Sequence, residues 1–318
     1  MTTAAQTKPA SGGLSRQSIM RIVSILGMAF LVFFAFIQLM PFVLTIANSF
    51  KCLPAAEQLP QAFVPVPPFN VDCRAPSGAT LPASATTSGV TFNTTNDGYN
   101  RIFGFDLPRW FVNTIIYAFL VTVFRVVFDS MAGYALARLS FPGNRVMFFL
   151  MLGTMMIPGV VLLIPRFIIL RQLGMLNTYQ GVVFALAADA FGVFLMKQFF
   201  ESIPKEIEEA AQVDGANHFT IFFRVILPMA TPALTALTIF SFQGTWNNFM
   251  DVLIIVGGKP DLYNLPLGLA LLRGQFGQTL EWNTFLAGAV ITTLPLALVF
   301  FSFQRYFVEG ISYSGVKG

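Results

Sequence analysis

The residues best suited to bind another protein lie in one acidic stretch between two apolar segments. Its landmarks are Glu209, Ala210, Ala211, Asp214, Gly215, Leu227 and Pro228. The two carboxylates can accept hydrogen bonds, and the two alanines are small enough to let a helix lie deep in the groove of a partner. The pattern indicates a surface that a partner protein can grip.

Local signals predict that this stretch is helical. Pro204 suits a first helical turn, and the acidic residues that follow it lie near the positive end of the helix dipole. Gly215 falls where a helix commonly ends, because glycine adopts a left-handed cap without a steric penalty. We therefore expect a short helix over about 204–213 and a second one over about 217–225.

Composition places the chain in a membrane. Hydrophobic residues make up 55% of the chain and charged residues 11%, and the mean hydropathy is +0.69, whereas roughly 25% of a soluble domain is charged. A spanning helix needs about 20 mostly apolar residues that satisfy their own backbone. Six stretches qualify, at roughly 22–47, 111–135, 146–170, 178–199, 232–256 and 284–307. The predicted fold is an all-α membrane protein of six transmembrane helices, with the acidic stretch between the fourth and the fifth.

The predicted segments differ in composition. Residues 1–18 are expected to form a disordered tail, and 19–49 a first transmembrane helix, since its apolar run is too long for a signal peptide. Residues 50–110 are rich in Pro, Ala, Ser and Thr, so we expect an irregular external loop. Residues 111–318 form the membrane core, and the acidic loop occupies 201–228.

The two cysteines, Cys52 and Cys73, both fall in the external loop. On an oxidising side of the membrane a disulfide between them would stabilise the loop by about 3 kcal/mol. Two free thiols are the alternative. Because His218 is the single histidine of the sequence, no metal site is expected.

The basic residues of the loops indicate the orientation of the chain. Lys and Arg are more numerous on the side that carries both termini and the acidic loop. Since cytoplasmic loops carry this excess, both termini are expected in the cytoplasm. No basic cluster is dense enough to indicate nucleic-acid binding.

The stretch EAAQVDGANHFTIFFRVILP resembles the signature loop of the membrane-spanning permease subunits of binding-protein-dependent ABC importers. That family has EAA, three residues, Gly, nine residues, an aliphatic residue, one residue and Leu-Pro, and Val225 takes the aliphatic position here. The C-terminal segment 310–318 is similar to the tail of the maltose-type carbohydrate subgroup. The resemblance covers most of residues 110–318.

The resemblance implies a non-enzymatic permease subunit in a prokaryotic inner membrane. It also implies a second permease, two ATP-binding subunits that hold ATP and Mg, and an extracellular or periplasmic binding protein that delivers a carbohydrate. In the family, a coupling helix sits in a socket of the ATP-binding subunit. This role falls on Glu209, Ala210, Ala211, Asp214 and Gly215. The chain itself has no G-x-x-x-x-G-K-[ST] phosphate loop.

Polar residues within the spans are candidates for a substrate path. They are Asp189, Gln243, Trp246, Asn247 and Asn248. Amides beside an aromatic ring suit a neutral sugar, whose hydroxyls need donors and acceptors and whose C–H face needs an apolar plate. Hydrogen bonding between helices would leave the same pattern, and Asp189, with no charged neighbour within a turn, fits either role.

A charged pair is predicted on the second span. Arg125 and Asp129 are four residues apart and share a helical face, so they can pair and ease the cost of burying either charge. A structural role is favoured over a role in transport.

The alternative to an ABC permease is an ion-coupled secondary transporter or channel. That class predicts paired intramembrane acids, arginine ladders or duplicated broken helices, and it gives no reason for the pattern over 209–228. An intramembrane enzyme is disfavoured further, because the sequence has no H-E-x-x-H cluster.

Overall fold

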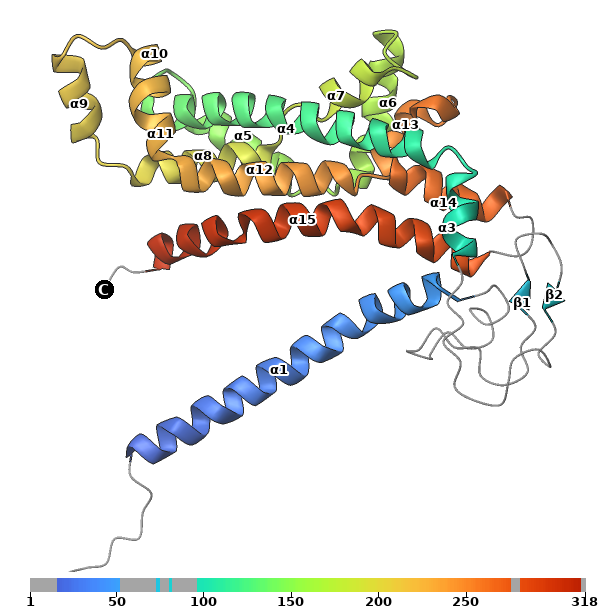
Figure 1. Ribbon diagram of the computed structural model, residues 1–318. Coiled ribbons are helices and arrows are strands. Elements are labelled where there is room, and N and C mark those ends of the chain that lie inside the picture. Colours follow the sequence, from blue (N-terminus) through green and yellow to red (C-terminus); the bar gives the residue numbers. More distant parts are fainter. Residues whose placement is uncertain (1–15, 52–72, 75–79, 82–95, 276–280, 316–318) are drawn as a thin grey trace, which may run out of the picture.

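The structure is a computed structural model that describes residues 16–51, 73–74, 80–81, 96–275 and 281–315. Nearly all of them are helical (Figure 1). Among the described residues the β structure is a pair of two-residue antiparallel strands, β1 (Cys73–Arg74) and β2 (Thr80–Leu81).

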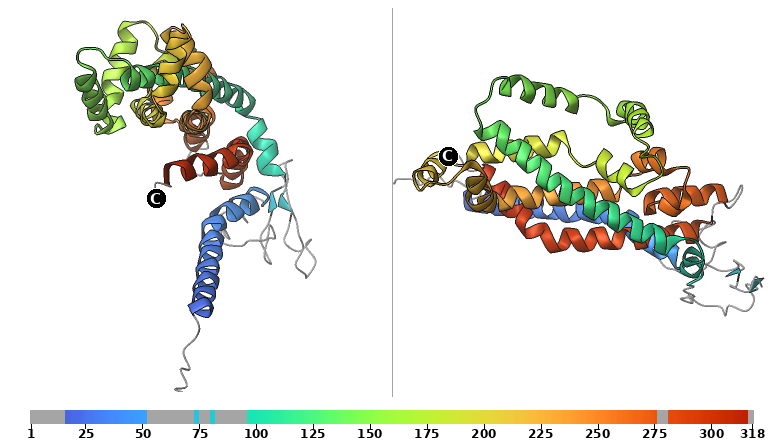
Figure 2. Two further views of the ribbon diagram at one scale, coloured as in Figure 1. Left: turned by 90° about the vertical axis from the view of Figure 1, so that its left-hand side faces the viewer. Right: turned by 90° about the horizontal axis from the view of Figure 1, so that it is seen from above.

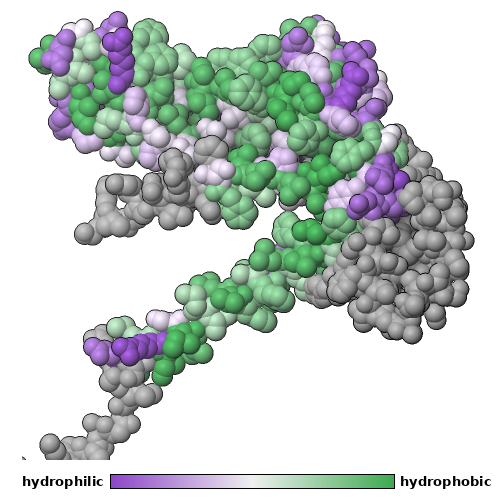
Figure 3. Space-filling view, in the orientation of Figure 1, coloured by the Kyte–Doolittle hydropathy of each residue, from purple (hydrophilic) through white to green (hydrophobic). Residues whose placement is uncertain are grey.

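Three helices are each long and apolar enough to cross a membrane. They are α1 (Arg16–Ser49), α4 (Leu107–Arg138) and α15 (Trp282–Gly315). Hydrophobic side chains cover the middle of the body and α1, and hydrophilic ones gather at the two ends of the body (Figure 3). Such a band is what a membrane-spanning protein presents to lipid.

Three bent pairs of helices are also apolar and long enough, which gives up to six spans in the described part of the chain if each pair is one span. The first pair joins α5 (Asn144–Met155) to η2 (Gly159–Leu162) and α6 (Leu163–Gln172) at 102°. The span predicted over 146–170 is therefore not one continuous helix. The cause is Pro158. A residue that precedes proline disfavours the helical region, so α5 ends before it, and Pro158 itself has an extended ψ.

The other two pairs are α7 (Tyr179–Ala185) with α8 (Ala190–Ser202), at 44°, and His218–Met229 with α12 (Thr231–Trp246), at 80°. The fifth predicted span, over 232–256, also breaks, since α12 ends at Trp246 and α13 (Met250–Val256) starts anew. The chain continues through η4 (Pro260–Leu262) and α14 (Leu265–Gln275).

α4 is the central helix and contributes to three buried clusters along its length. One surrounds Trp110 and another surrounds Tyr117. In the third, Tyr134 packs against Phe200 of α8 and Phe222, with ring centroids 5.9 and 4.9 Å from its own. One helix therefore connects the two ends of the body.

Glycines allow α4 and α8 to approach each other closely. A Cβ on Gly133 would stand 2.8 Å from the Cβ of Met196, and a Cβ on Gly192 would collide with the Asp129 carboxylate. In lipid, helices associate through such close packing at small residues, because apolar burial gives them little driving force. α4 and α8 thus form a closely packed pair.

α1 stands apart from the body along most of its length (Figures 1 and 2). Its apolar side chains are exposed until the last turn, where Ala47, Asn48 and Ser49 are buried. The helix already begins at Arg16, inside the tail expected over 1–18. An apolar surface of this extent needs lipid or another subunit to cover it.

Part of the segment expected to be an irregular external loop is helical. α3 (Asp97–Phe103) lies within it, and α4 already begins at Leu107. α3 packs against α15. Arg101 pairs with Asp97 and with Glu281, at N–O distances of 3.2 and 2.6 Å, and so ties α3 to the start of α15. A seven-residue helix has too few turns to show a clear apolar period, which is why composition did not reveal it.

Candidate functional site

The acidic stretch folds into a short helix closed by a tight turn. Ile203 is extended, as residues before proline tend to be, and α9 (Glu206–Val213) begins two residues later than expected. Gly215 has a φ of +81°, and its N–H donates to the carbonyl of Gln212 at 2.9 Å. The left-handed glycine cap expected from the sequence is present.

The second predicted helix, over 217–225, is less regular than expected. α10 (His218–Ile221) is followed by a wider π-helical turn, η3 (Phe222–Ile226), and by α11 (Leu227–Met229). In a regular α-helix the ring of Pro228 would clash with the carbonyl four residues earlier, so the wider turn accommodates it.

α9 carries most of the predicted coupling residues on its outer surface, at the end of the body away from α3 (Figure 1). The exposed ones are Glu209, Ala210, Asp214 and Gly215. Val213, between them, is 89% exposed. Ala211 differs, because it is half-buried and packs against the cluster around Phe200 and Phe222.

Glu208 is buried on the inner side of α9 and has a partner that the sequence did not reveal. Its Oε1 lies 2.9 Å from the Nε of Arg138, and the two side chains are 11% and 3% exposed. Arg138 Nη2 also donates to the carbonyls of Phe200 and Ile203. In the sequence Arg138 counts only as a loop charge, and no local spacing relates it to Glu208.

The fourth predicted span is interrupted between α7 and α8. Asp189 therefore starts α8 instead of standing in mid-helix, and 41% of its side chain is exposed. Arg125 Nε donates to the Leu186 carbonyl at 2.8 Å, and its Nη1 lies 3.7 Å from Asp189 Oδ2. The Asp189 N–H donates to Asp129 Oδ1 at 3.0 Å. Two charged side chains of α4 thus satisfy backbone and side-chain groups at the interruption, where lipid would not.

These contacts bear on two expectations. Asp189 has no charged neighbour within a turn, as the sequence shows, but Arg125 of another helix pairs with it, which is the inter-helix role. The predicted pair of Arg125 with Asp129 is not among the ion pairs of the described residues. Arg125 turns to Asp189, and Asp129 turns to the backbone of α8.

The polar residues predicted on the fifth span lie on different faces of α12. Gln243 and Asn247 are both exposed, and Asn247 Nδ2 donates to the Gln243 carbonyl at 3.1 Å. Trp246 is only 1% exposed. Its Nε1 donates to the carbonyl of Thr292 at 3.1 Å, and its ring stacks on Phe242 with centroids 5.4 Å apart. Trp246 therefore belongs to the core, and its ring face is not accessible to a sugar.

Asn248 lies in the turn between α12 and α13. Its Oδ1 accepts from the N–H of Asp251 at 3.1 Å, and its Nδ2 donates to the Asp251 carboxylate at 2.8 Å. Such side-chain bonds to the first turn compete with continuation of α12. The asparagine predicted to line a path thus holds the turn between the two helices through its bonds to Asp251.

An exposed stripe runs along α12. We define the α12 stripe as Phe240, Gln243, Gly244 and Asn247, all exposed and spaced at helical intervals. Phe191 of α8 meets Phe240 edge to face, with ring centroids 5.6 Å apart. Open space surrounds Gly244. Exposed aromatic rings therefore do adjoin the amides, although Trp246 is not one of them.

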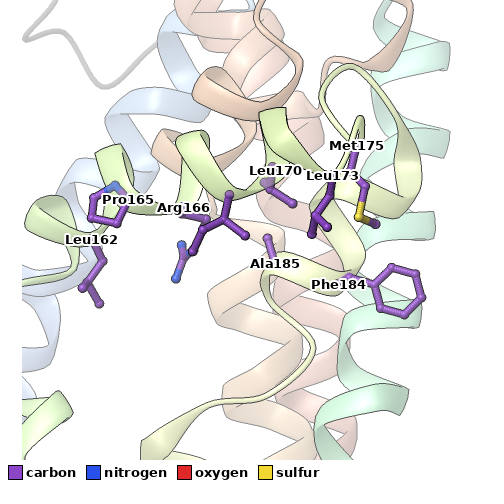
Figure 4. A pocket seen from close by; sticks show the side chains of 9 residues that line it. Leu162, Pro165, Arg166, Leu170, Leu173, Met175, Phe184 and Ala185 are labelled. Atoms are coloured by element: carbon purple, nitrogen blue, oxygen red, sulfur yellow. The ribbon is translucent and has the colours of Figure 1, made fainter.

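A cavity of about 370 Å³ lies between α6 and α7 (Figure 4). Its walls are almost all hydrophobic and consist of Leu162, Pro165, Ile169, Leu170, Leu173, Met175, Phe184 and Ala185, with Arg166 as the charged member. Arg166 is paired with Asp251. Such walls suit a hydrocarbon and not the hydroxyls of a sugar.

The disulfide between Cys52 and Cys73 stays a prediction. Cys52 lies outside the described residues, and only the backbone of Cys73 is described, in β1.

Comparison with known proteins places these features in a family. Residues 129–313, which include the interruption and α9, match the family described as binding-protein-dependent transport system inner membrane component. The arabinooligosaccharides transport system permease protein AraQ of Halalkalibacterium halodurans is 37% identical over 209 residues, which are 66% of this chain and 74% of that protein. The trehalose/maltose transport system permease protein MalG of Thermococcus litoralis is 32% identical over 234 residues, 72% of this chain and 84% of that protein.

A solved structure shows the same fold. It is described as a bacterial ABC transporter involved in the import of the acidic polysaccharide alginate. One of its chains matches with a TM-score of 0.72 and 25% identity, over 93% of this chain and 100% of that one. Because the family match spans more than half of the sequence, this chain belongs to the binding-protein-dependent transport system inner membrane components, the permeases of ABC importers.

Proposed function

We propose that this chain forms half of the translocation path of an ATP-driven importer, beside a second, similar permease. Two ATP-binding subunits hold ATP and Mg, and an extracellular binding protein delivers a carbohydrate. Family membership supports the permease role and gives no support to an ion-coupled transporter or channel.

The exposed face of α9 is the observation that carries the proposal. Carboxylates of Glu209 and Asp214 flank Val213, which is almost fully exposed at one end of the body. An apolar side chain ringed by acceptors is suited to a protein partner that can cover it and donate hydrogen bonds. We assign Glu209, Ala210, Asp214 and Gly215 to contact with an ATP-binding subunit, and Ala211 to the seating of α9 on the permease.

The α12 stripe and Asp189 supply the candidate substrate path. The stripe combines the exposed side-chain amides of Gln243 and Asn247 with an aromatic ring, and the Asp189 carboxylate is 41% exposed at the start of α8. These groups fit hydroxyls and the C–H face of a sugar. The names of the relatives, which mention arabino-oligosaccharides, trehalose and maltose, support an oligosaccharide as cargo.

The position of α9 supports the proposed orientation. α1 begins and α15 ends at the end of the body that carries α9 (Figure 1). If α9 contacts an ATP-binding subunit, these ends lie in the cytoplasm, in agreement with the excess of basic residues in the loops of that side.

The proposal is tested by purifying the tagged chain from its native host in mild detergent and identifying the proteins that travel with it. We expect a second permease and ATP-binding subunits. After reconstitution in proteoliposomes with the binding protein, ATP should drive uptake of one of three probes, arabinotriose, maltose or an alginate oligosaccharide, but not of methionine. Recovery as a homo-oligomer without an ATPase, or uptake that an ion gradient drives without ATP, would overturn the proposal.

A further inference from the structure

Arg138 joins three helices at the α9 end of the body. It is the last residue of α4, and its Nε lies 2.9 Å from Glu208 Oε1 in the first turn of α9. Its Nη2 donates to the Phe200 carbonyl at 2.6 Å and to the carbonyl of Ile203. One buried guanidinium therefore contacts the end of α8 and the start of α9.

The two carbonyls lie at the C-terminal end of α8, where the Phe200 carbonyl also accepts the Ile203 N–H at 3.2 Å. α8 ends at Ser202, and Pro204 cannot continue the helix by supplying an N–H. A guanidinium presents five donors in a planar fork, so it can bind both carbonyls and a carboxylate at once. Arg138 is thus both the cap of α8 and the ion-pair partner of α9.

α4 and α8 are also tied together at the other end of α8. Asp129 of α4 accepts the N–H of Asp189, where α8 starts. Between these two ties, Gly133 and Gly192 bring the helices into close packing. A displacement of the end of α8 is therefore shared by α4 along its length, which reaches from α9 to α3 (Figure 1).

Neighbouring carboxylates of α9 face different surroundings. Glu209 is exposed, whereas Glu208 is turned into the body against Arg138. A buried carboxylate that loses its cation is left uncompensated, so this pair resists separation more than a surface pair would. α9 is consequently held to α4 on one side while its other side stays open to a partner.

We propose that the ion pair of Arg138 and Glu208 transmits the movement of α9 into the permease. It does so on the inner side of α9, opposite the face that contacts the ATP-binding subunit. Arg138 is a positioning residue that passes a displacement of α9 to the α4–α8 pair, and so to the interruption beside Asp189. This inference rests on the proposed function, in which the outer face of α9 contacts the ATP-binding subunit.

The test measures ATP hydrolysed per sugar imported in the complete complex, reconstituted with the binding protein and whichever of arabinotriose, maltose or alginate oligosaccharide it imports. Glu208→Gln keeps the shape of the side chain and removes its charge. We expect this variant to retain its ATP-binding subunits but to raise the ratio about threefold or more. Glu206→Gln, an exposed carboxylate of the same helix, is the matched control and should leave the ratio unchanged.

A double-mutant cycle separates transmission from simple loss of structure. Arg138→Gln should raise the ratio as well, and the double variant should be no worse than the poorer single variant, because both remove one interaction. Arg138→Lys keeps the charge without the fork and should give an intermediate ratio. The ratio is taken per assembled complex, so a lower yield of folded protein does not alter it.

The outcomes distinguish this inference from the proposed function. A wild-type ratio in Glu208→Gln and in Arg138→Gln would overturn the inference while leaving the ATP-driven permease intact. Additive effects of the two substitutions would also overturn it. Failure of the unaltered chain to retain any ATP-binding subunit would instead overturn the proposed function.

Discussion

Arg125 of α4 donates a hydrogen bond of 2.8 Å to the carbonyl oxygen of Leu186, the first residue after α7. The bond joins a charged side chain to a backbone carbonyl just beyond the end of α7, inside the segment predicted as the fourth span. Together with the Asp129 carboxylate, which accepts from the Asp189 N–H, it makes α4 the support of an interruption in its neighbour.

Replacing Arg125 tests this support. Arg125→Ala should lower the free energy of unfolding by about 1–3 kcal/mol, since it removes a charge-assisted bond and leaves the Leu186 carbonyl without that donor. Arg171→Ala, an exposed arginine at the end of α6, should have little effect. Thermal unfolding of the purified complex in detergent measures both, and equal midpoints for the two variants would contradict the assignment.

Gly215 tests the cap of α9. A side chain at φ +81° is strained although open space surrounds the position, so Gly215→Ala should cost about 1 kcal/mol and Gly215→Asn less. Hydrogen exchange at the amides of residues 215 and 216 should accelerate more in Gly215→Ala than in Gly215→Asn. Gly153→Ala, also in open space but within α5, should be neutral or slightly stabilising. Equal exchange in Gly215→Ala and wild type would contradict the strain argument.

Trp246 and Gln243 should behave oppositely although they are near neighbours in sequence. Trp246→Ala should destabilise the protein by about 3–5 kcal/mol, because it empties a buried site. Gln243→Ala should change stability by less than about 0.5 kcal/mol but raise the sugar concentration needed for half-maximal uptake. Unfolding midpoints and uptake curves decide. An unchanged uptake curve for Gln243→Ala would remove the α12 stripe from the path.

Gly192 tests the close packing of α4 and α8. A methyl group there would meet the Asp129 carboxylate and a Leu237 methyl, so Gly192→Ala should cost about 1–3 kcal/mol by overpacking. Adding Asp129→Ala should relieve part of that cost, so that the two effects are not additive. Strict additivity of the unfolding free energies would show that the two residues do not touch.

Local features were predictable from the sequence where one segment determines its own conformation. Gly215 ends α9 with a left-handed cap, and the apolar runs around 22–47 and 111–135 do form long helices. Hydropathy averaged over about 19 residues cannot reveal a break such as that before Asp189, because its stabilising groups come from α4. The burial of Trp246 and the pairing of Glu208 with Arg138 likewise depend on neighbours distant in sequence.

α1 packs against α15 and is buried only in its last turn, which has a consequence for how the protein is made. All the backbone bonds of such a helix are internal, so α1 can enter the bilayer before the later spans have been synthesised and need not wait for them to fold. Substitutions along its exposed length should therefore leave the folding of the single chain unaffected. Their effects should appear only when lipid or another subunit covers α1. The sequence of α1 is therefore constrained by assembly and not by packing within this chain.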